Sequence, residues 1–98
     1  MCAEAYHEPF DIIPEEGRDQ HRALVSMIEE LQAVDWYHQR VLATKDAELR
    51  AILEHNRDEE KEHASMLMEY LRRRDSALSK YAKRFLFSEG SITDLEED

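Results

Sequence analysis

The chain has 98 residues, which suffices for one domain over residues 1–98 and no more. Its formal net charge of -10 at pH 7 argues against a nucleic-acid partner, because phosphate binding needs a basic surface, and it favours attraction of cations. No apolar run approaches the roughly 20 residues of a membrane-spanning helix, and the first residues do not resemble a signal peptide.

Long helices are the expected elements, because only two glycines and two prolines interrupt the chain. Residues 1–12 are expected to form an irregular N-terminal arm. Pro14 suits the first turn of a helix, and nothing beyond Gly17 stops that helix before about Thr44. The side chains that form its apolar stripe, three and four residues apart, are Met27, Glu30, Val34, Tyr37 and Val41, widened by Leu24, Ile28 and Leu31.

A second helix is expected after a turn at 43–46, with Thr44 or Asp46 as its N-cap. Its apolar stripe contains Leu49, Leu53, Asn56, Glu60, His63, Leu67, Tyr70 and Arg74. The two helices then form a hairpin over residues 13–75. A short third helix over 76–87 and a flexible acidic tail over 88–98 complete the predicted fold, which is all-α with two long antiparallel helices.

A monomer of this composition is expected to be only marginally stable. Charged residues make up 37% of the chain, compared with about 25% in ordinary globular domains, so each helix can bury only one face. We therefore expect a homo-oligomer. The single cysteine, Cys2, cannot form an internal disulfide, which fits a reducing compartment.

A Glu-x-x-His motif, formed by Glu60 and His63, lies within the stripe of the second helix. Residues three positions apart leave a helix on one face, so both polar groups point where Leu53 and Leu67 are expected to be buried. Burial of a carboxylate and an imidazole is unfavourable unless something compensates, and a metal ion is a common compensation. The motif therefore predicts part of a metal site.

The first helix places one carboxylate, that of Glu30, within its own apolar stripe. In a hairpin that turns at Lys45, Glu30 lies fifteen residues before the turn and Glu60 fifteen after it. At about 1.5 Å per residue, both lie roughly 22 Å from the turn and at the same level. We therefore expect Glu30, Glu60 and His63 to meet.

One copy of the chain supplies half of a familiar ligand set. Di-iron carboxylate bundles use a Glu from each of two helices and a Glu-x-x-His from each of the other two. Two copies related by a twofold axis supply the whole set, so a site at a dimer interface is expected. Such ligands suit iron or manganese, and zinc could also bind. Oxidation of Fe(II) by dioxygen is the leading chemistry.

Other interpretations remain open at this point. The buried Glu and His of a non-catalytic helical oligomerisation module could merely set its register, and a di-metal protein of the same architecture could reduce peroxide instead. Asn56 and Tyr70 either orient ligands or fix register, and a packing role is favoured over a redox role for Trp36 and Tyr37. The residues expected at the surface or in ordinary packing are His7, His21, His38, His55, Met66 and Met68.

The chain resembles the encapsulated ferritins, small ferritin-like proteins housed in bacterial encapsulin compartments. The matching stretches are His7-Glu8-Pro9, His21-Arg22-Ala23, Ser26 to Leu31, Ala33 to Tyr37, Asn56 to Ala64, Leu71 to Asp75 and Tyr81 to Gly90. The resemblance implies that dimerisation completes a ferritin-like four-helix bundle and that dimers assemble into a decameric ring.

The same resemblance implies a function and its residues. The ligands of a di-iron ferroxidase centre fall on Glu30, Glu60 and His63 from both chains of the dimer, with Tyr37 close by and counted among the catalytic residues. The family oxidises Fe(II) with dioxygen in the bacterial cytoplasm, inside an encapsulin nanocompartment, and the shell stores the product.

Two departures from the family pattern concern iron delivery and packaging. The acidic cluster that leads iron toward the site falls on Glu29 and position 32, which here is Gln32, so the expected path involves Glu29, Gln32 and Trp36, together with Asp35. The C-terminal docking peptide typical of encapsulin cargo has no counterpart before Asp98.

Overall fold

The computed structural model describes residues 5–97, so Cys2 and Asp98 lie outside it. Three α-helices account for most of these residues: α1 (Glu15–Ala43), α2 (Ala47–Arg72) and α3 (Ser76–Phe85). Single 3-10 turns, η1 (Phe10–Ile12) and η2 (Thr93–Leu95), lie on either side, and no strand occurs in the described range. The expected all-α fold is confirmed. Within residues 5–97, no helix is long and apolar enough to cross a membrane.

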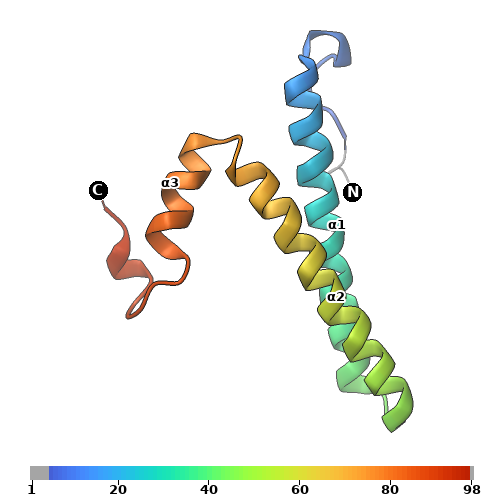
Figure 1. Ribbon diagram of the computed structural model, residues 1–98. Coiled ribbons are helices and arrows are strands. Elements are labelled where there is room, and N and C mark those ends of the chain that lie inside the picture. Colours follow the sequence, from blue (N-terminus) through green and yellow to red (C-terminus); the bar gives the residue numbers. More distant parts are fainter. Residues whose placement is uncertain (1–4, 98) are drawn as a thin grey trace.

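Helices α1 and α2 run antiparallel and are joined by a tight turn (Figure 1). Of the two N-cap candidates, Asp46 caps α2, because its Oδ1 atom accepts a hydrogen bond of 2.8 Å from the backbone N–H of Leu49. The Arg50 side chain donates to the carbonyl oxygens of Val41, at 3.3 Å, and of Thr44, at 2.5 Å. These bonds satisfy carbonyl groups at the end of α1 and hold the turn closed.

Helix α3 turns back from the end of α2 and stands away from α1 (Figure 1). Asp75 caps it by accepting a hydrogen bond of 2.9 Å from the backbone N–H of Leu78. Arg72 of α2 donates to Ser79 Oγ at 3.0 Å, which ties the two helices together. After α3 the chain passes through Phe87, whose φ of 61° lies in the left-handed region that non-glycine residues rarely adopt.

The N-terminal arm folds against the start of α1 through aromatic contacts. The ring centroid of Tyr6 lies 4.1 Å from that of His21 and 5.4 Å from that of Phe10. Arg18 stacks on the Phe10 ring at 3.7 Å and donates to its carbonyl oxygen at 2.8 Å. His21, expected at the surface, is therefore half-buried under Tyr6, a contact that helix periodicity could not reveal.

The hydrophobic core of one protomer is thin. No large side chain in the described residues is fully buried, and the core consists of Ala23, Val41, Ala64, Leu71 and Ala82. Leu49, predicted to be buried, is 45% exposed because nothing else in residues 5–97 covers its side of the hairpin.

The protomer is also too open for a self-sufficient domain. Its accessible surface is 7736 Å², whereas a compact chain of 11.6 kDa exposes about 5,800 Å². Its radius of gyration is 17.1 Å, compared with about 13 Å for a compact chain of this length. The chain has the shape of a part of a larger helical bundle.

Candidate metal centre

The structure brings Glu30 of α1 together with Glu60 and His63 of α2. One ligand atom from each side chain lies within 4.8 Å of the others. His63 Nδ1 is 3.5 Å from Glu30 Oε2 and 3.8 Å from Glu60 Oε2. These separations exceed those of good hydrogen bonds, so the three groups face a common point rather than satisfying one another.

The position of the cluster in the hairpin explains its partial burial. Glu60 and His63 are one helical turn apart on the face of α2 that meets α1, and Glu30 faces them from α1. The side chains of Glu30 and Glu60 are 26% and 24% exposed, whereas that of His63 is 42% exposed. The cluster is therefore closed toward the hairpin and open on the side of His63.

One oxygen of the cluster has an unusual environment. Glu30 Oε2 is buried and has no hydrogen-bond partner. An unsatisfied buried acceptor costs about 1–3 kcal/mol, and more when it is charged. A bound cation would satisfy it, and two carboxylates with one imidazole are suitable donors for iron, manganese or zinc. These residues therefore fit a divalent metal, but three side chains are too few to hold two ions.

The other candidate residues of α1 lie outside the cluster. Tyr37 is half-buried two turns closer to the hairpin turn, with the Arg40 guanidinium 5.6 Å from its ring centroid. Glu29, Gln32 and Trp36 are exposed. Asp35, which belongs to the expected iron path, is also exposed and accepts a hydrogen bond of 3.1 Å from Gln39.

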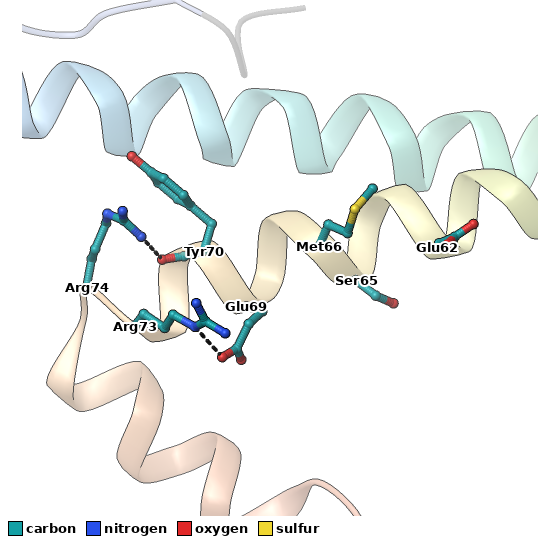
Figure 2. A pocket seen from close by; sticks show the side chains of 7 residues that line it. All are labelled: Glu62, Ser65, Met66, Glu69, Tyr70, Arg73 and Arg74. Atoms are coloured by element: carbon teal, nitrogen blue, oxygen red, sulfur yellow. Dashed lines mark hydrogen bonds and ion pairs between the residues drawn. The ribbon is translucent and has the colours of Figure 1, made fainter.

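A separate hollow of about 540 Å³ lies on α2 toward α3 (Figure 2). Its lining residues are Glu62, Ser65, Met66, Glu69, Tyr70, Arg73 and Arg74. The Glu69 carboxylate accepts hydrogen bonds from Arg72 and Arg73, which lower its pKa to about 2. Arg74 stacks on Tyr70 at 3.7 Å and donates to its carbonyl oxygen. The Glu69 carboxylate is therefore paired with two arginines.

Comparison with known proteins identifies the family to which this helical hairpin belongs. A family model described as EncFtn-like matches residues 5–89. The chain belongs to the EncFtn-like family. The resemblance to the encapsulated ferritins that the sequence motifs indicate is thereby confirmed.

Individual EncFtn-like relatives match over most of the chain. An "Encapsulated ferritin-like protein" of Rhodospirillum rubrum is 57% identical over 90 residues, which cover 92% of this chain but only 64% of that protein. A "Ferritin-like protein" of Thermotoga maritima is 51% identical over 96 residues, which cover 98% of this chain and 84% of that protein. The chain thus spans less than two thirds of the length of the first relative.

A solved structure shares the same arrangement of helices. The crystal structure of a protein from Nitrosomonas europaea is 57% identical in sequence and superposes with a TM-score of 0.87. The match covers 90% of this chain and 97% of that one. The EncFtn-like hairpin with its short third helix is therefore a fold that a close homologue adopts in a crystal.

One contact between α1 and α2 was not anticipated from the sequence. Arg57 of α2 reaches His38 of α1, with 3.2 Å between Nη1 and Nδ1, although His38 was expected to be an ordinary surface residue. The residues are 19 positions apart, and no local pattern links an arginine on one helix to a histidine on another. Only the register of the hairpin brings them together.

Proposed function

We propose that this EncFtn-like chain is a ferroxidase that acts as a dimer and oxidises Fe(II) to Fe(III) with dioxygen. Each protomer contributes Glu30, Glu60 and His63 to a shared di-iron site, and Fe(II) is the substrate. The observation that supports this most directly is the meeting of two carboxylates and an imidazole around the unsatisfied Glu30 Oε2 atom.

The open side of the cluster supports pairing of two copies there. Ile52 and Met66 lie eleven residues before and three residues after His63, so they share its side of α2, and both are more than half exposed. Two separate protomers expose roughly 3,800 Å² more surface than two compact chains of the same mass would. An obligate homodimer typically buries an area of this size at its interface. A twofold axis beside His63 would join two half-sites and cover these apolar side chains.

The residues of the site have distinct roles in this proposal. The carboxylates of Glu30 and Glu60 bind Fe(II) and offset its charge, while His63 adds a neutral donor. Two Fe(II) ions held side by side can each give one electron to the same dioxygen molecule, which takes up two protons and leaves as hydrogen peroxide. The product, Fe(III), is the harder ion and hydrolyses readily, which favours its release. Tyr37 lies next to the ligands when the dimer forms.

Delivery of iron depends on the acidic surface. The net charge of -10 raises the local concentration of cations around the protein. Glu29, next to Glu30 in the sequence, and Trp36, further along α1, are both exposed and, with Gln32 and Asp35, form the proposed path to the site. Gln32 carries no charge, so we expect Glu29 to provide most of the attraction along this path.

A second apolar surface supports assembly beyond the dimer into a decameric ring. Leu24, Ile28 and Leu31 of α1 are 43% to 52% exposed. Leu31 also lines an apolar groove of about 540 Å³ that extends to Phe87, beyond α3. Lys61 of the same groove points about 200° round α2 from His63, so this surface faces away from the proposed twofold axis.

We also propose that the oxidised iron passes to an encapsulin shell, within the bacterial cytoplasm. The support is the relative from Rhodospirillum rubrum, which is named as encapsulated and aligns with 92% of this chain. Co-expression with an encapsulin, followed by purification of intact shells, tests this partner. Absence of the chain from the shells would contradict this partner.

The ferroxidase proposal is tested by adding Fe(II) to metal-free protein without oxygen and then admitting air. We expect native mass spectrometry to show two irons per dimer and absorbance to show rapid formation of Fe(III). Glu30→Ala should abolish rapid oxidation without loss of helicity, whereas Glu54→Ala, an exposed carboxylate of α2, should oxidise iron like the unmodified protein. Oxidation by Glu30→Ala at the normal rate would contradict the site.

A further inference from the structure

The contact between Arg57 and His38 has a defined chemical direction. Arginine has only donors, so Arg57 Nη1–H donates to His38 Nδ1 across 3.2 Å, and the proton of the neutral imidazole lies on Nε2. Arg57 Nε also donates to Asp58 Oδ1 at 3.0 Å. The Arg57 side chain is only 16% exposed, so it lies against the hairpin rather than extending into solvent.

The antiparallel helices direct these two side chains toward each other. Every Cα–Cβ bond in a helix tilts toward the N-terminus of that helix. Arg57 therefore leans toward the hairpin turn, where α2 begins, and His38 leans away from the turn. Arg57 is one turn of α2 before Glu60, and His38 is eight residues, about 12 Å, along α1 from Glu30, so the bond crosses between the helices on the hairpin-turn side of the metal ligands.

The register of the two helices matters at this position because the ligands come from both of them. Displacement of α2 along α1 by a single residue would move Glu60 and His63 by about 1.5 Å relative to Glu30. Functional sites need their groups held within about 0.5 Å of the productive geometry. Two of the four buried residues of α1 and α2 are alanines, Ala23 and Ala64, and side chains this small constrain the register of two helices less than large ones do.

We propose that the Arg57–His38 hydrogen bond is a positioning device that sets the register of α1 against α2 at the metal site. The two residues do not touch the metal and act through the placement of Glu30, Glu60 and His63. This inference rests on the proposed function, since it assumes that the cluster binds a metal.

This role can be tested without iron oxidation by measuring how tightly the whole protein binds Co(II), with the visible absorption of the bound ion as the readout. His38→Ala and Arg57→Ala should each weaken Co(II) binding about tenfold, as loss of groups that orient ligands usually does. The double variant should bind no more weakly than either single variant, because both lose the same bond. His38→Asn keeps an acceptor where Nδ1 lies and should restore binding and the absorption spectrum.

Arg22→Ala is the matched control, because Arg22 is paired with Glu15 and Asp19 within α1 alone. Its Co(II) affinity should be unchanged. Unchanged affinity in His38→Ala, additive losses in the double variant, or failure of His38→Asn to restore binding would each overturn the inference. If instead Glu30→Ala bound Co(II) as tightly as the unmodified protein, the proposed metal site itself would be wrong.

Discussion

The Nδ1 atom of His63 lies 3.5 Å from the Oε2 atom of Glu30, which is buried and accepts no hydrogen bond. Glu60 approaches the same nitrogen to 3.8 Å. Two carboxylates thus share one imidazole at distances that suit a common ligand better than direct bonds. This relationship links the stability of the metal-free protein to its proposed function, because the arrangement that accepts a cation is unfavourable without one.

Replacement of Glu30 by methionine should separate the stability of the metal-free protein from its ability to bind a metal. Glu30→Met removes the unsatisfied buried acceptor, so the free energy of unfolding of the metal-free protein should rise by about 1 kcal/mol. For a domain of this size, that raises the Tm by about 4–8 °C. Co(II) should stabilise the unmodified protein further but leave Glu30→Met unaffected. Calorimetry with and without Co(II) measures both effects, with Glu54→Met as the exposed control.

A lower Tm for metal-free Glu30→Met than for the unmodified protein would contradict this prediction. It would mean that the Glu30 carboxylate stabilises the metal-free hairpin through its neighbours and does not lower the free energy of unfolding.

The ion pairs of Glu69 predict a stability that depends on pH. Hydrogen bonds from Arg72 and Arg73 lower the pKa of Glu69 from 4.5 to about 2. Because the pKa is lower in the folded than in the unfolded protein, the stabilisation is complete above about pH 4.5 and is lost as the pH falls toward about 2. Glu69→Gln should therefore be less stable than the unmodified protein at neutral pH, and the difference should shrink on acidification.

Urea unfolding at a series of pH values between about 7 and about 3 measures this difference. Glu54→Gln serves as the control for loss of a negative charge on the same helix. A difference for Glu69→Gln that stays constant over this range would show that the carboxylate is not selectively stabilised in the folded protein.

Phe87 offers a test of assembly beyond the dimer. Its side chain is fully exposed in the protomer, and its φ of 61° costs a residue with a Cβ about 1–2 kcal/mol. Such a conformation is explained if a neighbouring dimer binds the ring. Phe87→Asn tolerates the same backbone and should stop assembly at the dimer while leaving iron oxidation intact.

Native mass spectrometry measures the assembly of Phe87→Asn, and Ser88→Ala tests whether any change in this segment has the same effect. Formation of the full assembly by Phe87→Asn would exclude Phe87 as an anchor between dimers.

Much of the hairpin could be predicted because its signals are local. Asp46, one of the two expected N-caps of the second helix, caps α2 in the structure. Pro14, expected inside the first turn, instead occupies the N-cap position of α1. The spacing of Glu30, Glu60 and His63 also predicted their meeting, because helical rise converts equal distances from a turn into equal heights.

Burial could not be predicted in the same way. The spacing that marks the apolar row Leu24, Ile28 and Leu31 does not say whether the protomer or a partner covers it, and in the protomer it remains largely exposed. The contacts of His21 with Tyr6 depend on how the arm folds back, which no periodic pattern encodes.

The sequence by itself determined the helices and the faces that their side chains share, because these follow from backbone geometry over a few neighbouring residues. Only the tertiary structure decided that Glu30 Oε2 is buried without a partner and that Arg57 reaches His38. Both depend on the separation, rotation and register of two helices, which the packing of residues distant in the chain sets to within a fraction of a turn.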